Sequence, residues 1–157
     1  MVNAGSADFV RDQISAAIQA GASAHLDEGS HALDHRGSAY LGPQVLTGVD
    51  HSMSVMTEES FGPVVGIMPV KSDEQAIRLM NDSRFGLSAS IWTSDAAAAR
   101  EIGAQIETGT VFMNRCDYLD PALAWTGVKE TGRGATLSQI GYETLTRPKS
   151  FHFRFTN

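Results

Sequence analysis

The sequence predicts an α/β fold with a mainly parallel sheet and crossover helices. Between residues 64 and 113, three apolar segments alternate with two segments of helical pattern. This alternation is the order that parallel strands joined by crossover helices require. The first apolar segment is almost continuous, as in strands buried on both faces. Ligands of such sheets gather at the carboxyl ends of the strands, so the loop after the third strand is the first region to search for a site.

The N-terminal part predicts a helix, a loop and a short strand. Residues 5–20 have the helical pattern, with Ser6 as a capping residue and Gly21 as the stop. The apolar face of this helix, which we expect to be part of the core, consists of Phe9, Val10, Ile14, Ala17 and Ile18. Residues 22–42 are polar and irregular, which favours a surface loop, and residues 44–47 predict a strand. The loop holds three histidines with no helix or strand to fix their geometry, so we predict no metal site; they are His25, His31 and His35.

The middle of the chain carries the regular alternation. The expected elements are a strand at 64–70, a helix from the capping box of Ser72 and Gln75 to about residue 82, a strand at 87–93, a helix capped by Ser94 and ended by Gly109, and a strand at 110–113. Asn114 follows the last strand directly, which places it at the ligand-binding edge of the predicted sheet.

The C-terminal part predicts a glycine-rich turn region, a helix and an alternating strand. Residues 127–134 contain three glycines and two cations but fit neither common phosphate-binding pattern. We therefore interpret these glycines as positions of positive φ or close backbone approach. Residues 137–145 predict a helix. Residues 150–155 alternate phenylalanine with polar residues, and an edge strand with such an aromatic face needs a partner surface.

Composition excludes several classes of partner. The chain of 157 residues is 42% hydrophobic and 19% charged, which is typical of a soluble globular domain. A net charge of −6 argues against a nucleic-acid partner, and no apolar run approaches the length of a membrane span. The single cysteine, Cys116, rules out an internal disulfide and suits a reducing compartment. With no signal-peptide pattern at the N-terminus, we expect a cytoplasmic protein.

Four ordered motifs resemble the aldehyde dehydrogenase superfamily. They are Glu58-Glu59-Ser60-Phe61-Gly62-Pro63, Asn81 with Phe85-Gly86-Leu87-Ser88-Ala89, Gly109-Thr110-Val111-Phe112-Met113-Asn114, and Gly127-x-Lys129-x-x-Gly132-x-Gly134. The resemblance extends from about residue 5 to residue 155. It is to the C-terminal part of the family's catalytic domain, followed by an oligomerisation strand, which divides this chain into residues 1–149 and 150–157.

The resemblance implies oxidation of an aldehyde to a carboxylic acid through a cysteine thioester, with NAD or NADP as hydride acceptor. In the family, the nucleophile, the general base and the nucleotide-binding domain lie upstream of the matched stretch. The resemblance therefore places no catalytic residue in this chain, and we expect the chain alone to be inactive and to bind no cofactor. Cys116 does not match the catalytic position.

The resemblance also assigns roles residue by residue. Glu59 is expected to hydrogen-bond the nicotinamide ribose, and Phe61 to pack beside the nicotinamide. The aldehyde tunnel is expected to be lined by Asn114, Cys116, Leu119 and Trp125. Two departures from the family pattern occur: Gly134-Ala135-Thr136 stands in place of Gly-Arg-Glu, and Trp125-Thr126-Gly127 in place of Phe-Gly-Gly. The second departure leaves the substrate open.

Two hypotheses of function follow. In the first, the chain is part of an NAD(P)-dependent aldehyde dehydrogenase that acts on a small aldehyde and forms a homo-oligomer through residues 150–155. In the second, it is a stand-alone, non-catalytic assembly domain that keeps the fold. Whether the coding sequence continues in frame upstream of Met1 distinguishes them. The aldehyde, the choice between NAD and NADP, and the number of subunits stay open.

Overall fold

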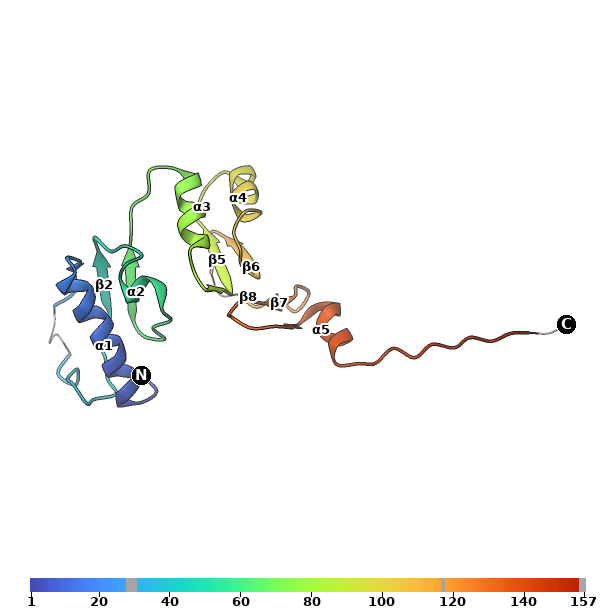
Figure 1. Cartoon of the computed structure of the whole chain (residues 1–157), viewed down its shortest axis with the longest axis horizontal. Coiled ribbons are helices and arrows are strands. Elements are labelled where there is room, and N and C mark those ends of the chain that lie inside the picture. Colours follow the sequence, from blue (N-terminus) through green and yellow to red (C-terminus); the bar gives the residue numbers. More distant parts are fainter. Residues whose placement is uncertain (28–30, 117, 156–157) are drawn as a thin grey trace. The chain divides into compact units, whose positions relative to one another are not determined.

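The computed structural model describes residues 1–27, 31–116 and 118–155. The chain divides into two compact units, Met1–Val70 and Lys71–Asn157, each with its own helices and strands (Figure 1). Both units combine helices with small sheets, which confirms the predicted α/β class. No helix in the described ranges is long and apolar enough to cross a membrane.

The first unit is a three-stranded sheet covered on one face by a helix. Its elements are α1 (Ala4–Gln19), β1 (Ser23–Ala24), β2 (Gln44–Thr47), α2 (Ser54–Thr57) and β3 (Val64–Ile67). In the order β1-β2-β3, the first pair is antiparallel and the second parallel. Val10 and Ile14 of α1 pack on Leu46 of β2 in the core. The predicted helix and the strand at 44–47 are therefore confirmed.

Three details of this unit differ from the predictions. The helix is capped by Asn3 rather than Ser6, because the side chain of Asn3 accepts a hydrogen bond from the Ser6 N–H at 2.8 Å. The strand predicted at 64–70 ends at Ile67 and is not buried on both faces, since Val65 and Ile67 are each 52% exposed. Their side chains alternate with those facing α1, and within this unit the described residues do not cover the second face.

A short strand lies inside the region predicted as loop, and Gln44 explains it. The side-chain oxygen of this residue, which is only 6% exposed, accepts hydrogen bonds from the N–H groups of His25, Leu26 and Val45 at 3.1, 3.0 and 2.9 Å. Its side-chain nitrogen donates to the Leu26 carbonyl at 3.0 Å. A single buried amide thus holds the chain after β1 against β2.

The second unit contains a parallel strand pair and two antiparallel ones. Its elements are α3 (Asp73–Asn81), β4 (Phe85–Gly86), β5 (Ser88–Ile91), α4 (Ala96–Gly103), β6 (Thr110–Met113), β7 (Trp125–Thr126), β8 (Val128–Lys129), β9 (Ala135–Thr136) and α5 (Ser138–Thr144). β5 pairs with β6 in parallel, while β4–β8 and β7–β9 are antiparallel. Within the described residues the strands form small sheets, and β3 pairs with β2 rather than with β5.

The helix boundaries test the capping signals. Ser72 caps α3 as predicted, accepting from the Gln75 N–H at 3.3 Å. α4 begins one residue later than predicted, because Asp95 rather than Ser94 accepts from the N–H groups of Ala97 and Ala98. The helix also ends at Gly103, well before Gly109. The predicted helix at 137–145 is confirmed as α5.

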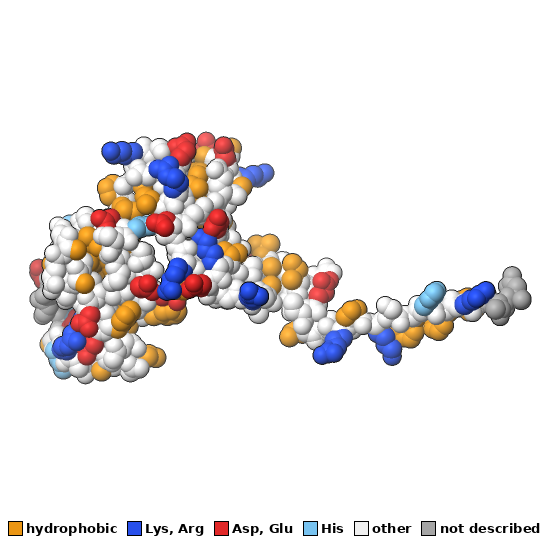
Figure 2. All heavy atoms as spheres, in the orientation of Figure 1, with side chains coloured by type: hydrophobic (Ala, Val, Ile, Leu, Met, Phe, Trp, Pro, Cys, Tyr) orange, Lys and Arg blue, Asp and Glu red, His pale blue; other side chains and the backbone are white. Residues whose placement is uncertain are grey.

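Residues 150–155 form no strand ladder within the described chain. Phe151, Phe153 and Phe155 are 67, 68 and 88% exposed. Neighbouring ring centroids in this row lie 5.8 and 6.4 Å apart, so the three rings share one side as the alternation predicts. Figure 2 shows hydrophobic and cationic side chains along this terminal segment. Pairing with another subunit requires a second chain, so the oligomerisation strand stays a prediction.

Candidate functional site

The turn that carries Glu59 and Phe61 is held at both ends. After α2, the Glu58 N–H donates to the Ser54 carbonyl at 2.8 Å. On the other side, the Pro63 carbonyl accepts from the Gln44 N–H, also at 2.8 Å, where the chain enters β3. A Cβ atom at Gly62 would lie 2.9 Å from a methyl group of Val10, so this turn packs directly on α1.

Phe61 adopts a left-handed backbone with its ring in solvent. Its φ is +45°, and 85% of the residue is exposed. For an L-residue other than glycine this conformation costs roughly 1–2 kcal/mol, and it persists where the surroundings impose it. An exposed ring held at a strained turn is poorly explained by packing, which favours a role in ligand contact.

Glu59 and Phe61 share a hollow of about 830 Å³ with the start of α1. Glu59 is exposed, and its carboxylate has no hydrogen-bond or ion-pair partner among the residues described. The lining also includes the exposed apolar residues Val2 and Phe9, which sequence analysis did not assign to a site. Sequence analysis placed Phe9 on the buried apolar face of the helix, which is wrong, because Phe9 is 50% exposed and does not belong to the buried stripe of α1. The hollow offers an acceptor for hydroxyl groups beside an apolar wall.

A second hollow, of about 230 Å³, lies in the second unit along β6. Trp125, predicted to line the aldehyde tunnel, is part of its wall. The other three predicted tunnel residues are placed differently. The Asn114 amide donates to the Thr93 carbonyl at 2.8 Å and accepts from its N–H at 2.9 Å, while Cys116 and Leu119 are exposed. The tunnel role of these residues stays a prediction.

The glycines of the motifs serve close backbone approach and positive φ, which was predicted only for those of residues 127–134. A Cβ at Gly109 would lie 1.7 Å from the Thr126 carbonyl oxygen, and one at Gly86 would lie 2.3 Å from that of Glu107. In the glycine-rich segment, φ is +135° at Gly132 and +92° at Gly134. The close approaches at Gly86 and Gly109 pack β4 against the backbone of Glu107 and the start of β6 against β7, whereas Gly132 and Gly134 have no atom within 4 Å of an added Cβ.

Lys129 and Asn81 of the motifs connect the same framework. The Lys129 ammonium donates to the carbonyls of Asn81 and Ser83 at 2.7 and 3.0 Å and forms an ion pair with Glu107 at 2.8 Å. The Asn81 amide in turn bonds the backbone of Gln105 and Glu107 at 2.8 Å each. Because Lys129 already has three partners, its position supports a structural role.

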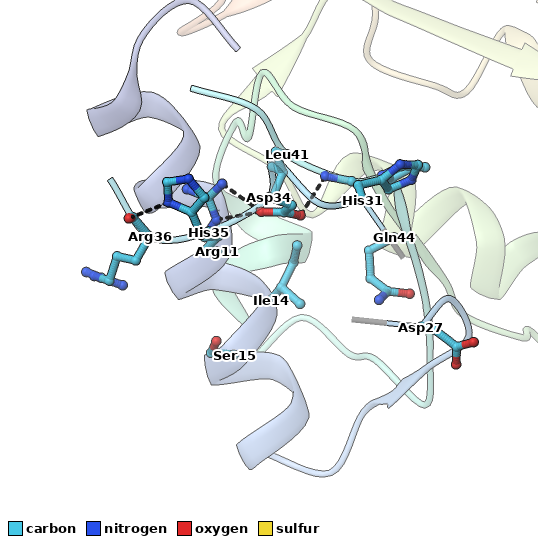
Figure 3. Close-up of a pocket in the computed structure, with 12 residues that line it drawn as sticks. Arg11, Ile14, Ser15, Asp27, His31, Asp34, His35, Arg36, Leu41 and Gln44 are labelled. Carbon is cyan, nitrogen blue, oxygen red and sulfur yellow. Dashed lines mark hydrogen bonds and ion pairs between the residues drawn. The ribbon is translucent and has the colours of Figure 1, made fainter. Parts of the chain in front are cut away.

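A polar hollow of about 230 Å³ beside α1 contains charged groups that bond to one another (Figure 3). Arg11 reaches the Asp34 carboxylate at 2.7 Å and Asp8 at 2.7 Å, and it also donates to the backbone carbonyls of Ser38 and Tyr40. No group of three potential metal-ligating side chains occurs within the described ranges. The charged side chains around this hollow form an ion-pair network that holds residues 34–40 on α1.

We expect acid to destabilise the first unit through this network. Burial alone would raise the pKa of Asp34, but the Gly42 N–H and Arg11 outweigh it and hold the pKa below its ordinary value. The Gly37 N–H, followed by Arg11, likewise lowers the pKa of Asp8. Because the folded pKa values are depressed, this stabilisation is complete above the unfolded value of about 3.9 and is lost as the pH falls through the folded values.

Urea unfolding between pH 6 and pH 3 measures this effect. Asp34→Asn should lower the free energy of unfolding at pH 6 by about 1–3 kcal/mol and flatten its decline in acid. Asp27→Asn is the matched control, because Asp27 lines the same hollow without an ion-pair partner among the described residues. Equal pH profiles for the wild type and Asp34→Asn would contradict the prediction.

The fold is that of an α/β protein, and two of its hollows lie at a turn and beside a strand. The model of the aldehyde dehydrogenase family matches residues 1–151, and the chain belongs to that family. The predicted resemblance is therefore confirmed.

Relatives of known structure and name agree with this assignment. The NAD(P)+ succinate semialdehyde dehydrogenase Sad of Escherichia coli K12 is 45% identical over 102 residues, which are 65% of this chain and 22% of that protein. Indole-3-acetaldehyde dehydrogenase AldA of P. syringae, solved with NAD+, matches with a TM-score of 0.85 at 29% identity over 96% of this chain and 30% of that one. Succinic semialdehyde dehydrogenase of Streptococcus pyogenes, solved with NADP+, matches with a TM-score of 0.77 at 36% identity over 88% and 30%. The chain thus spans less than a third of the length of these relatives.

Proposed function

We propose that this chain forms part of the cofactor- and substrate-binding surface of an NAD(P)-dependent aldehyde dehydrogenase. The observation that carries the proposal is the pair of Glu59, an exposed carboxylate without a described partner, and Phe61, an exposed ring on a left-handed backbone in the same hollow. The names of the relatives, which include both NAD+ and NADP+, support a nicotinamide cofactor. We infer that the complete enzyme oxidises a small aldehyde.

The residues of the first hollow fit a nicotinamide riboside. The cofactor supplies the acceptor of the hydride when it is bound. A carboxylate such as Glu59 accepts hydrogen bonds from two neighbouring hydroxyl groups, which suits a ribose. The Phe61 ring offers an apolar face to the base, and Phe9 extends that apolar surface from α1. These residues orient the cofactor and perform no chemical step, so the chain alone is expected to be inactive.

The exposed sheet face supports the proposal that other parts of an enzyme complete the fold. Val65 and Ile67 form an apolar strip on β3, which is costly to leave in water. We propose that the parallel pairs β2–β3 and β5–β6 belong to a mainly parallel sheet of the catalytic domain, formed by residues 1–149 with the rest of the enzyme. In the same proposal, residues 150–157 are the oligomerisation strand and the enzyme is cytoplasmic.

Glu59→Gln tests the cofactor role in a complete enzyme that contains this chain. We expect hydride transfer to slow by about 10- to 100-fold, because a misplaced nicotinamide loses near-attack geometry. Single-turnover formation of NADH or NADPH measures it. Glu58→Gln is the matched control and should change the rate less, since Glu58 does not line the described wall of the hollow. An unchanged rate in Glu59→Gln would show that the assigned role is wrong.

We expect the 157-residue chain to self-associate through its terminal phenylalanines, with a two-fold dimer as the simplest closed form. Light scattering at micromolar concentration should give a mass well above 16.8 kDa for the whole chain. Replacing Phe151, Phe153 and Phe155 together by serine should reduce the mass to that of a monomer. Replacing Ser150 and His152 by alanine on the opposite side is the control and should leave the mass unchanged. A monomer in every case would rule out this strand as an interface.

A further inference from the structure

The second hollow combines an apolar wall with a cation at its exposed rim. Phe112 and Met113 of β6 contribute the wall together with Leu123 and Trp125. Arg115, directly after β6, also lines the hollow. A cation beside an aromatic and aliphatic surface is suited to a ligand with an apolar body and one anionic end.

The Arg115 guanidinium stacks on an aromatic ring of the same loop. Its guanidinium carbon lies 3.8 Å from the centre of the Tyr118 ring, which is a stacking distance. Its backbone carbonyl accepts a hydrogen bond from the Ser90 hydroxyl, so the main chain is anchored as well. Within the described part of the chain, no carboxylate or carbonyl oxygen accepts from this guanidinium. A stacked guanidinium keeps the planar fork that binds a carboxylate through two parallel hydrogen bonds.

Two further polar groups line the same hollow. The Asp120 carboxylate accepts from the Ala122 N–H at 2.9 Å, and the Asp120 carbonyl accepts from the Leu123 N–H at 3.0 Å, so this acid stabilises its own turn. The Thr110 hydroxyl is buried and has no hydrogen-bond partner among the described atoms. Because this oxygen has almost no accessible surface, it is not available to a ligand in the hollow.

We infer that Arg115 is a specificity-determining residue that binds the carboxylate of an aldehyde substrate carrying such a group, with the apolar chain or ring of that substrate along Trp125. The identification of the ligand as a substrate rests on the proposed function, whereas the carboxylate site itself depends only on Arg115 and the hollow. Neither the exposed thiol of Cys116 nor the engaged amide of Asn114 takes part in it.

Binding to the 157-residue chain, without cofactor or turnover, tests the inference. The probe is 3-phenylpropionate, and 3-phenylpropionamide is its neutral counterpart of the same shape. The indole N–H resonance of Trp125, assigned through Trp125→Phe, reports occupancy of the hollow. We expect the carboxylate to shift this resonance at a concentration about tenfold or more below that needed for the amide.

Substitutions of Arg115 and of Arg133 separate the contribution of charge to binding from that of packing. Arg115→Met keeps an apolar stem and should weaken binding of the carboxylate about tenfold or more without changing that of the amide, and Arg115→Lys should retain part of the preference. Arg133→Met removes an arginine that does not line the hollow and should change neither. Equal binding of both probes, no shift with either, or an unchanged preference in Arg115→Met would each overturn the inference. Because no turnover is measured, these results are independent of the Glu59→Gln experiment that tests the proposed function.

Discussion

Gly109→Ala should lower the free energy of unfolding of the second unit by about 3 kcal/mol or more, the upper part of the range for core substitutions. The added Cβ would lie 1.7 Å from the Thr126 carbonyl oxygen and 2.5 Å from its carbonyl carbon. Both atoms belong to the backbone of β7, which is paired with β9, so neither moves aside as a side chain would. The midpoint and slope of urea unfolding measure the loss.

Gly132→Ala is the control for Gly109→Ala. Gly132 has a φ of +135° but no atom within 4 Å of an added Cβ, so its substitution tests backbone conformation without a clash. We expect a cost of about 1–2 kcal/mol, smaller than at Gly109. Equal losses for the two variants would show that β7 is free to shift away from residue 109. Because Trp125 belongs to β7, the same result would also weaken the inferred geometry of the second hollow.

Gln44→Leu should destabilise the first unit by about 2–4 kcal/mol. The substitution keeps a side chain of similar size but makes it apolar, and it leaves the N–H group and the carbonyl of Leu26 without their partner, whereas the His25 N–H keeps its hydrogen bond to the Val45 carbonyl at 3.0 Å. Each buried backbone group left unsatisfied costs about 1–3 kcal/mol, although water recovers part of this near the surface. Urea unfolding gives the free energy, and hydrogen exchange of the amides at 25 and 26 localises it.

Gln13→Leu is the matched control for Gln44→Leu. Gln13 is also buried and belongs to the same unit, but its side-chain oxygen has no hydrogen-bond partner among the described atoms, and its nitrogen reaches the Ser54 carbonyl only at 3.4 Å. Replacing a poorly satisfied buried amide by an apolar side chain is expected to be nearly neutral or stabilising. If Gln13→Leu costs as much as Gln44→Leu, loss of packing rather than of hydrogen bonds explains both.

The cofactor hollow illustrates what a motif predicts and what it leaves out. The motif singles out Glu59 and Phe61 by residue type and order, and the structure places both in one hollow with solvent access. The part played by Phe9 is absent from the motif, because it depends on how the start of α1 packs against the turn at Gly62. The roles of Glu59 and Phe61 toward the cofactor stay predictions.

The sequence by itself determined the elements whose signals are local. The capping box at Ser72, the apolar stripe of α1 and the α/β alternation each depend on residues within a few positions of one another. The family motifs likewise identified the family, since the order and type of residues are what they compare. Even here the exact caps shifted, from Ser6 to Asn3 and from Ser94 to Asp95, because neighbouring polar side chains compete for the same N–H groups.

Only the tertiary structure decided the features that join distant segments. The side chain of Gln44 accepts hydrogen bonds from backbone N–H groups 18 and 19 residues earlier in the chain. Gly109, which has no Cβ, lets the carbonyl of Thr126 approach closely. The exposed face of β3 and the engagement of Asn114 by Thr93 also depend on which segments lie nearby. Hydrogen bonds and close contacts of this kind arise when two segments meet in space, and their energies depend on distance and direction. Local patterns of residue types do not predict such long-range contacts, because the same residues could equally face water.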